Sequence, residues 1–335
     1  MRSKLEHVPL RRADSARCAS LESGAVTATS PPDPAAPIHI DHDGHRTMLK
    51  WHRGRRRADD TAFTATRIVE GMRLGASIEI DLVIHAERGF AVLHDRTVDH
   101  ATTGTGVVSA LPASYLRELS LRDNRGRPVD EHVLLLEDLT ELFDGVDIAP
   151  TASLQLDFKE DDAALDPEAV AVFARSVAPH ARHYILSCGD AAAVDTLTSA
   201  APGIRIGYDP CHHGAADAAI RSGDFDGFVD RAVAASPEAE MVYLENRLIL
   251  AADHRGHDLI GAFHERGRLV DGYTVTRVGP RVIPDIRRLL ELRVDQITTD
   301  DPEALATLDL DAPARDSGSR LVRWIRGSSR RSDVQ

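Results

Sequence analysis

The sequence predicts an α/β protein built as a closed (β/α)8 barrel, and three observations support this fold class. Short apolar, often β-branched runs recur at intervals of roughly 25 to 40 residues with helix-period segments between them, which is typical of repeated strand and helix units. Nine such runs are present, and two of them are close enough to form a hairpin, so eight parallel strands remain. No Gly-rich phosphate loop follows the first strand, which disfavours an open doubly wound sheet.

The predicted elements alternate along most of the chain. Strands are expected near residues 48–52, 77–84, 89–94, 153–159, 183–188, 204–208, 241–245, 270–275 and 295–299. The second and third strands are separated by only a few residues around Glu87-Arg88-Gly89, so we expect an antiparallel hairpin arm after the second strand. Helices are expected near residues 62–74, 113–119, 136–143, 167–178, 190–200, 214–221, 254–267, 281–291 and 302–307.

Both ends of the chain differ in composition from the predicted barrel, which we place at residues 47–311. Residues 1–46 mix Arg, Ser, Ala and Pro without periodicity and predict a flexible leader. Residues 312–335 form a basic C-terminal tail that contains the basic and apolar stretch 320–326. Two interpretations of the tail stay open, a frayed or disordered terminus and a weak contact with an anionic membrane surface or a partner.

Composition excludes several classes of protein. At 335 residues, with 42% hydrophobic and 28% charged residues, the chain resembles soluble globular proteins that bury a substantial core. No apolar run approaches the roughly 20 residues that cross a bilayer, and no secretory signal is evident, so a cytoplasmic location is expected. Cys18, Cys188 and Cys211 follow no zinc spacing and cannot all pair, which disfavours a disulfide framework. The net charge of -13 argues against nucleic-acid binding, so a small-molecule substrate is expected.

Polar side chains gather where the predicted strands end, the place where barrel enzymes perform their chemistry. Glu79 and Asp81 share one face of the second strand because strand side chains alternate, and Asp157 and Lys159 share one face of a later strand. Taken alone, these carboxylates fit either a buried ion pair with Arg53 or Lys159, or a metal site. Oxygen ligands favour Mg²⁺, Ca²⁺ or Mn²⁺ over zinc.

Two histidines are expected to face the same opening. His52 follows the first strand, and His94 ends the return strand of the hairpin. A lone histidine in such a place is more often structural, but a pair can divide the roles of proton acceptor and donor that phosphodiester cleavage requires. Asp300 follows the last strand, and we expect it to cap the next helix rather than to bond within the site.

Six segments, in order and at sensible spacing, resemble the signature of the glycerophosphodiester phosphodiesterase family. They are His52-Arg53-Gly54, residues 75–81, Val92-Leu93-His94-Asp95 with residues 102–106, residues 154–159, Gly272-Tyr273-Thr274-Val275 and residues 294–302. The resemblance spans residues 48 to about 307 and implies a TIM barrel.

The resemblance also implies an activity and roles for individual residues. The family members are metal-dependent phosphoric diester hydrolases of lipid metabolism, which release glycerol 3-phosphate and an alcohol from glycerophosphodiesters. The positions that match the family's site imply a divalent metal on Glu79, Asp81 and Asp157, acid–base catalysis by His52 and His94, and phosphate contacts from Arg53 and Lys159.

The chain departs from the family pattern in three places. Thr61-Ala62-Phe63-Thr64 stands where the family usually has Pro-Glu-Asn-Thr at the start of the first barrel helix. The third metal ligand, usually Glu, is Asp157, which is one methylene shorter and needs backbone adjustment or a bridging water. The late aromatic residue, usually Trp, is Tyr273, which we regard with Glu245 as a candidate residue of the substrate pocket.

Two alternative functions stay open at this stage. The Asp-x-Lys arrangement at Asp157 also resembles the related sphingomyelinase D branch, so a sphingomyelinase D-like or lysophospholipase D-like phospholipid phosphodiesterase is the first alternative. The second is a noncatalytic phosphate-binding barrel, which the missing Glu-Asn pair suggests. Retention of both histidines and of the carboxylates argues against the second, because binding alone does not need paired histidines beside a metal.

Overall fold

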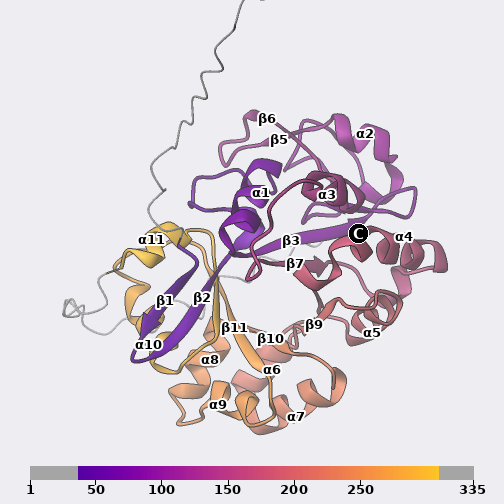
Figure 1. The fold of residues 1–335 in the computed structure, drawn as a ribbon. Coiled ribbons are helices and arrows are strands. Elements are labelled where there is room, and N and C mark those ends of the chain that lie inside the picture. The colour runs from indigo at the N-terminus through magenta and orange to yellow at the C-terminus, as the bar shows by residue number, and fades with distance from the viewer. Residues whose placement is uncertain (1–36, 309–335) are drawn as a thin grey trace, which may run out of the picture. The chain divides into compact units, whose positions relative to one another are not determined.

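Residues 37–308 are described in the computed structural model of this protein, and within this range eight parallel strands close into a barrel (Figure 1). The barrel strands are β2 (His45–Trp51), β3 (Ser77–Ile84), β7 (Ser153–Phe158), β8 (Tyr184–Cys188), β9 (Arg205–Tyr208), β10 (Met241–Glu245), β11 (Leu269–Val275) and β12 (Gln296–Thr299). Each strand pairs in parallel with the next, and β12 pairs with β2, which closes the barrel as the sequence predicts.

Helices surround the barrel in chain order (Figure 1). They are α1 (Ala65–Leu74), α2 (Ala113–Glu118), α3 (Leu136–Phe143), α4 (Pro167–Val177), α5 (Ala191–Ala200), α6 (Ala215–Ser222), α7 (Phe225–Ala235), α8 (Asn246–Asp253), α9 (Leu259–His264), α10 (Ile283–Glu291) and α11 (Pro302–Ala306). Aspartate side chains cap several of them. Asp166, for example, accepts the Ala169 N–H at the start of α4, where Pro167 occupies the first turn.

Four further strands form antiparallel pairs, two of them with strands of the barrel. β4 (Phe90–Val92) pairs with the end of β3, so the two closely spaced strands are antiparallel as expected. β5 (Ser120–Arg122) and β6 (Pro128–His132) form a separate two-stranded sheet that the sequence analysis did not predict. β1 (His39–His42) pairs with β2 through a turn at Asp43 and Gly44, two residues of positive φ.

β1 corrects the predicted boundary of the leader. Residues 39–46 were expected to be flexible, but they form β1 and the start of β2. The physical reason is that Ile40 is buried against the second half of the core, so the segment has an apolar anchor in a polar stretch. The rest of the predicted leader and the predicted basic tail lie outside the described residues.

Three helices also differ from the predictions. The helix predicted at residues 254–267 is shorter: Gly256 adopts a φ of 79° in a turn, and α9 begins only at Leu259, after its cap Asp258. The preceding helix α8 was not predicted. The helix α7 was missed, although Phe225, Phe228, Val229 and Ala232 follow the spacing of a helical apolar face.

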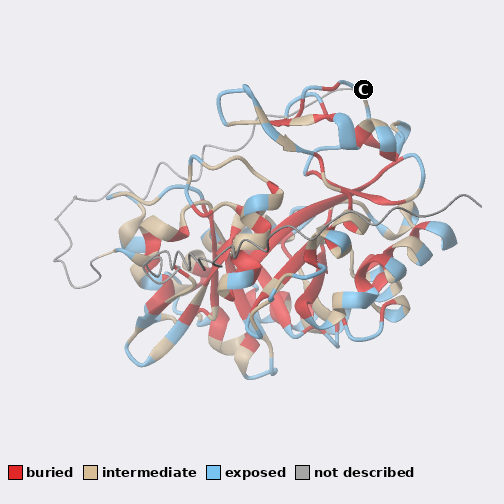
Figure 2. Cartoon of the chain, turned by 45° about the horizontal axis from the view of Figure 1, so that its top comes forward, coloured by how far each residue is buried: buried red, intermediate tan, exposed pale blue. Residues whose placement is uncertain are grey.

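The barrel strands are buried on both faces, and the helices expose their outer faces (Figure 2). All eight residues of β3 are buried. Apolar side chains form two large clusters, one centred on β3, β7 and β8 and the other on β10, β11 and β12. Among the described residues no helix is both long and apolar enough to cross a membrane.

A polar network crosses the interior of the barrel. The Lys50 ammonium group of β2 is 1% exposed, and its Nζ lies 3.0 Å from Asp271 Oδ2 and 4.2 Å from the centre of the Tyr243 ring. Lys50 also donates a hydrogen bond to Gln155 Oε1, and Thr298 Oγ1 donates to Asp271 Oδ1 at 2.6 Å. The network therefore links strands on opposite sides of the barrel through a buried ion pair.

We expect Lys50→Met to lower the free energy of unfolding by about 3 to 5 kcal/mol, because Asp271 would be left buried without a counter-charge. Urea unfolding followed by circular dichroism measures this loss. The double variant Lys50→Met with Asp271→Asn should recover part of the stability, since it removes both charges. Equal losses in the single and double variants would contradict a stabilising ion pair.

Candidate active site

Three carboxylates converge inside the carboxyl end of the barrel. Glu79 and Asp81 project from β3, and Asp157 projects from β7, where it is the direct neighbour of Asp81 in the strand register. One oxygen from each of the three lies within 4.8 Å of the others, and no second group of three potential metal ligands converges this way within residues 37–308. Glu79 is 4% exposed and Asp81 is fully buried.

Two cations lie against this carboxylate cluster. Lys159 follows β7 directly, and its ammonium group contacts both Asp157 and Asp81, the latter at 2.8 Å. Arg53 places its Nε 3.2 Å from Asp81 Oδ2, and its backbone N–H donates to Glu79 Oε2 at 2.8 Å. Arg53 lies in the short 3-10 turn His52–Gly54 with a φ of 55°, and this left-handed conformation accompanies the hydrogen bond to Glu79.

The electrostatics of the cluster reflect competition between burial and charge. Burial, and then the charge of Asp81, raises the pKa of Glu79 well above its usual range. Burial also opposes ionisation of Asp81, but Lys159 and Arg53 outweigh it and hold the pKa of Asp81 below its usual value. Burial disfavours the charged form of Lys159, yet Asp157 and Asp81 raise the pKa of its ammonium group. If all three carboxylates were ionised, the cluster would carry one negative charge more than Arg53 and Lys159 compensate, and the raised pKa of Glu79 reflects this excess.

The donor set fits a divalent metal ion. Both oxygens of Asp81 are buried, and charged groups lie against them: Lys159 Nζ is 2.8 Å from Oδ1, and Arg53 Nε is 3.2 Å from Oδ2. Two oxygens that bind one ion at about 2.0 to 2.6 Å lie no more than about 4 to 5 Å apart, which the cluster satisfies. Carboxylate oxygens without imidazole or thiolate are the ligands that Mg²⁺, Ca²⁺ and Mn²⁺ prefer.

Ser187 supports the shorter third carboxylate. Its hydroxyl on β8 donates to Asp157 Oδ1 at 2.6 Å and accepts from Gln155 Nε2 at 2.8 Å. Through Gln155 and Lys50, the network in the barrel interior therefore reaches the carboxylate cluster. These bonds fix the orientation of Asp157, while its other oxygen faces Lys159.

His52 lies beside the cluster with a fixed orientation. Its Nδ1 lies 2.6 Å from Asp300 Oδ1, and its Nε2 lies 4.0 Å from Glu79 Oε2. Because a carboxylate only accepts hydrogen bonds, Nδ1 carries the proton, and the Nε2 lone pair of the neutral ring faces the cluster. Burial lowers the pKa of His52 below that of an ordinary histidine, although the hydrogen bond to Asp300 opposes the shift.

The role of Asp300 differs from the prediction. We expected Asp300 to cap the helix that follows, but Asp301 does so by accepting the Ala304 N–H at 3.1 Å. Asp300 instead accepts a hydrogen bond from His52, and Arg55 Nη1 lies 3.0 Å from the same Asp300 oxygen. Asp300 and Asp301 are consecutive and precede Pro302, so the sequence alone does not distinguish which of the two caps the helix.

His94 is positioned differently from His52. It follows β4, its side chain is 42% exposed, and its Nδ1 lies 2.8 Å from Asp95 Oδ1. Its charge is among those that lower the pKa of Asp81. His52 is thus part-buried beside the carboxylates, whereas the His94 side chain is exposed to solvent.

A second polar group lies at the ends of β9, β10 and β11. Tyr273 donates its hydroxyl to Asp209 Oδ2 at 2.8 Å, and His212 Nε2 lies 3.1 Å from the same oxygen. The hydrogen bond to Asp209 raises the pKa of His212, and the charges of Asp157 and Lys159 also act on it. Asp209 was missed from the sequence, although it follows a predicted strand in the same way as the other site residues.

The Glu245 side chain is held by an ion pair beside the site. Its carboxylate forms an ion pair with Arg247, which also contacts Asp217. Glu245 nevertheless ends β10, and its charge contributes to the raised pKa of the Tyr273 hydroxyl after burial and Asp209. Glu245 and Tyr273 therefore lie at the same end of the barrel as the carboxylate cluster.

The departure from the family pattern at Phe63 has a structural counterpart. Phe63 is buried, its ring centre lies 5.9 Å from the Arg53 guanidinium carbon, and its N–H donates to the Arg53 carbonyl at 2.8 Å. Glu131 of β6 accepts the Ala65 N–H at 3.0 Å and so satisfies the start of α1. An apolar contact to Arg53 thus occupies the place of the family's polar residues.

Comparisons with known proteins agree with this geometry. The family model described as "Glycerophosphoryl diester phosphodiesterase family" matches residues 59–304. A search of curated proteins found no match.

Several solved structures share the fold. A glycerophosphodiester phosphodiesterase from Thermotoga maritima is 18% identical with a TM-score of 0.55, and the match covers 80% of this chain and 98% of that one. A glycerophosphoryl diester phosphodiesterase from Parabacteroides distasonis is 18% identical with a TM-score of 0.55, and the match covers 80% of this chain and 87% of that one. An Oleispira antarctica phosphodiesterase, solved with the product sn-glycerol-3-phosphate, is 15% identical with a TM-score of 0.54, over 77% of this chain and 94% of that one.

Proposed function

The chain belongs to the glycerophosphoryl diester phosphodiesterase family and is therefore a phosphoric diester hydrolase, and from this premise we propose that it cleaves glycerophosphodiesters to glycerol 3-phosphate and an alcohol. The proposal includes a divalent metal, Mg²⁺, Ca²⁺ or Mn²⁺, on Glu79, Asp81 and Asp157. The observation that carries it is the convergence of these three carboxylates, of which Glu79 and Asp81 are buried and Asp157 is part-buried, so that one oxygen of each lies within 4.8 Å of the others.

The cations of the site bind and orient the phosphate group. Arg53 and Lys159 already contact the carboxylates, and their remaining N–H groups are donors for the nonbridging phosphate oxygens of the substrate. When bound, the metal supplies further positive charge that offsets the charge growing on those oxygens. Lys159 also favours the ionised form of Asp81, because its charge lowers the pKa of that carboxyl group.

The two histidines divide the proton transfers. His52 takes a proton from the nucleophile at Nε2, because Asp300 holds its Nδ1–H and burial favours the neutral ring. His94 gives a proton to the departing alcohol from the solvent side of the site. The nucleophile is either water or a neighbouring hydroxyl of the substrate, which in the second case closes a cyclic phosphate first.

The substrate alcohol fits beside the second polar group. Glu245 ends β10 and Tyr273 lies near the end of the neighbouring strand β11, away from β3 and β7, which carry the carboxylates, so we assign both to the part of the substrate that is not phosphate. The Tyr273 hydroxyl, held by Asp209, offers a polar contact to this part of the substrate.

We expect purified protein to release glycerol 3-phosphate from glycerophosphocholine, to lose this activity in EDTA, and to regain it with Mg²⁺, Ca²⁺ or Mn²⁺. Glu79→Gln should weaken metal binding measured by calorimetry, while the matched control Asp230→Asn, a surface partner of Arg266, should not. Cleavage of lysophosphatidylcholine alone would assign the protein to a phospholipid substrate instead, which the Asp157 and Lys159 arrangement suggested from the sequence.

His52→Ala and His94→Ala should each lower kcat by about two orders of magnitude or more, the usual size of acid–base effects. His264→Ala is the matched control, because His264 pairs with Asp295 before the start of β12 and contacts no site residue. Near-normal rates in both site variants would refute the assignment.

Asp300→Asn should lower kcat at least about tenfold with little change in KM, because it disturbs the tautomer and orientation of His52 without touching the substrate. Steady-state kinetics with an unchanged metal affinity measure this split. A rise in KM alone, or a general loss of folding, would argue against a positioning role for Asp300.

A further inference from the structure

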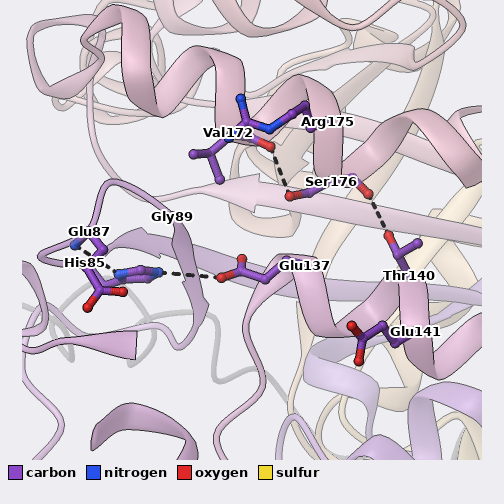
Figure 3. A pocket seen from close by; sticks show the side chains of 9 residues that line it. All are labelled: His85, Glu87, Gly89, Glu137, Thr140, Glu141, Val172, Arg175 and Ser176. Carbon is purple, nitrogen blue, oxygen red and sulfur yellow. Dashed lines mark hydrogen bonds and ion pairs between the residues drawn. The ribbon is translucent and has the colours of Figure 1, made fainter. Parts of the chain in front are cut away.

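A pocket lies outside the barrel opening, between the β3–β4 turn and the helices α3 and α4 (Figure 3). Its volume is about 430 Å³, within the range of small-molecule sites and far above the roughly 30 Å³ that one water occupies. The residues that line it include His85, Glu87, Gly89, Glu137, Glu141 and Arg175. None of these residues belongs to the catalytic group described above.

His85 is the first observation that points to a ligand. It follows β3 directly, is 2% exposed, and its Nδ1 accepts the Glu87 backbone N–H at 3.2 Å. In the neutral ring the proton is therefore on Nε2, and this donor has no hydrogen-bond partner among the described residues. Glu137 Oε1 lies 3.9 Å from Nε2, an ion-pair contact (dashed in Figure 3) that is longer than a hydrogen bond.

Glu137 is the complementary observation. Its Oε2 is a buried acceptor that also lacks a hydrogen-bond partner in the described part of the chain. Burial opposes ionisation of Glu137, but its contacts with His85, with its own backbone N–H and with Arg117 lower its pKa. The pocket thus presents an unpaired donor and an unpaired anionic acceptor side by side.

Gly89 makes room for this arrangement. A Cβ at position 89 would lie 2.4 Å from His85 Nε2 and 3.3 Å from Glu137 Oε1, so any larger residue would fill the space between them. The backbone of Gly89 does not have a positive φ, so the requirement for glycine here is steric.

The charge of the lining selects the class of ligand. The three carboxylates of Glu87, Glu137 and Glu141 outnumber two guanidinium groups, that of Arg175 in the lining and that of Arg117, which lies 3.4 Å from Glu137 Oε1, so the pocket favours a cation. His85 and Glu137 alone are too few ligands for a zinc ion, and the one converging group of three in residues 37–308 is in the barrel. A cation that fills this volume is therefore organic.

We propose that this pocket binds a small organic ammonium compound that also carries a hydrogen-bond acceptor. The ammonium group donates to Glu137, and the acceptor receives the Nε2–H of His85. The proposal does not depend on the reaction at the barrel opening, because it concerns separate residues.

The test is a ligand-observed NMR titration of the full-length protein with ethanolamine, which has both an ammonium group and a hydroxyl acceptor. We expect saturable binding, with affinity lowered at least about tenfold by Glu137→Gln, the usual effect of losing a charged hydrogen bond. Gly89→Ala should also weaken binding by filling the space beside His85. The matched control Glu168→Gln, which removes an exposed charge on α4 outside the pocket, should bind normally.

Comparison ligands keep the test decisive even where a variant is unstable. Choline has no N–H donor and ethylammonium has no acceptor, so both should bind the unaltered protein more weakly than ethanolamine. Equal binding of choline, or equal affinity in a folded Glu137→Gln variant, would overturn the proposal. Binding of Zn²⁺ that requires His85, without binding of ethanolamine, would also overturn it and identify a metal site.

Discussion

The burial of two carboxylates on one strand is the constraint on which the site depends. Glu79 and Asp81 are two residues apart on β3, so they face the same side and repel each other where water is excluded. Arg53 and Lys159 come from the ends of β2 and β7, the strands on either side of β3. These two cations compensate the buried negative charge. The turns that carry Arg53 and Lys159 therefore have to hold them against the carboxylates of β3.

Further support for the site comes from residues that do not reach the substrate. Asp300 orients His52, and Ser187 orients Asp157. Both supporting residues are on neighbouring strands or directly follow one, so the spacing of the barrel fixes them. Asp209, which follows β9, holds Tyr273 of β11 across the intervening strand β10. Rigid strand ends, rather than long loops, therefore carry the geometry of the site.

The sequence predicted those features that a local pattern of residue types determines. The alternation of Glu79 with Asp81 predicted their shared face, and the apolar runs located all eight barrel strands. Other features depend on tertiary contacts that no local pattern reports. The anchoring of β1 by Ile40 requires the second apolar cluster. Asp301 rather than Asp300 caps α11, because the end of β12 places Asp300 beside His52. The late start of α9 was visible in Gly256 and Asp258, a turn residue and a helix cap that lie inside the helix predicted at residues 254–267.

The Lys50 network also bears on how the chain folds. The two apolar clusters divide the barrel into an N-terminal and a C-terminal half, and β2 contributes Trp51 to the first and Leu49 to the second. Lys50 lies between them, with Gln155 from the first half and Asp271 from the second. Either half on its own would bury one charge without its partner, at a cost of several kcal/mol. The two halves therefore reach full stability only together, and the barrel folds as one cooperative unit instead of through a stable half-barrel.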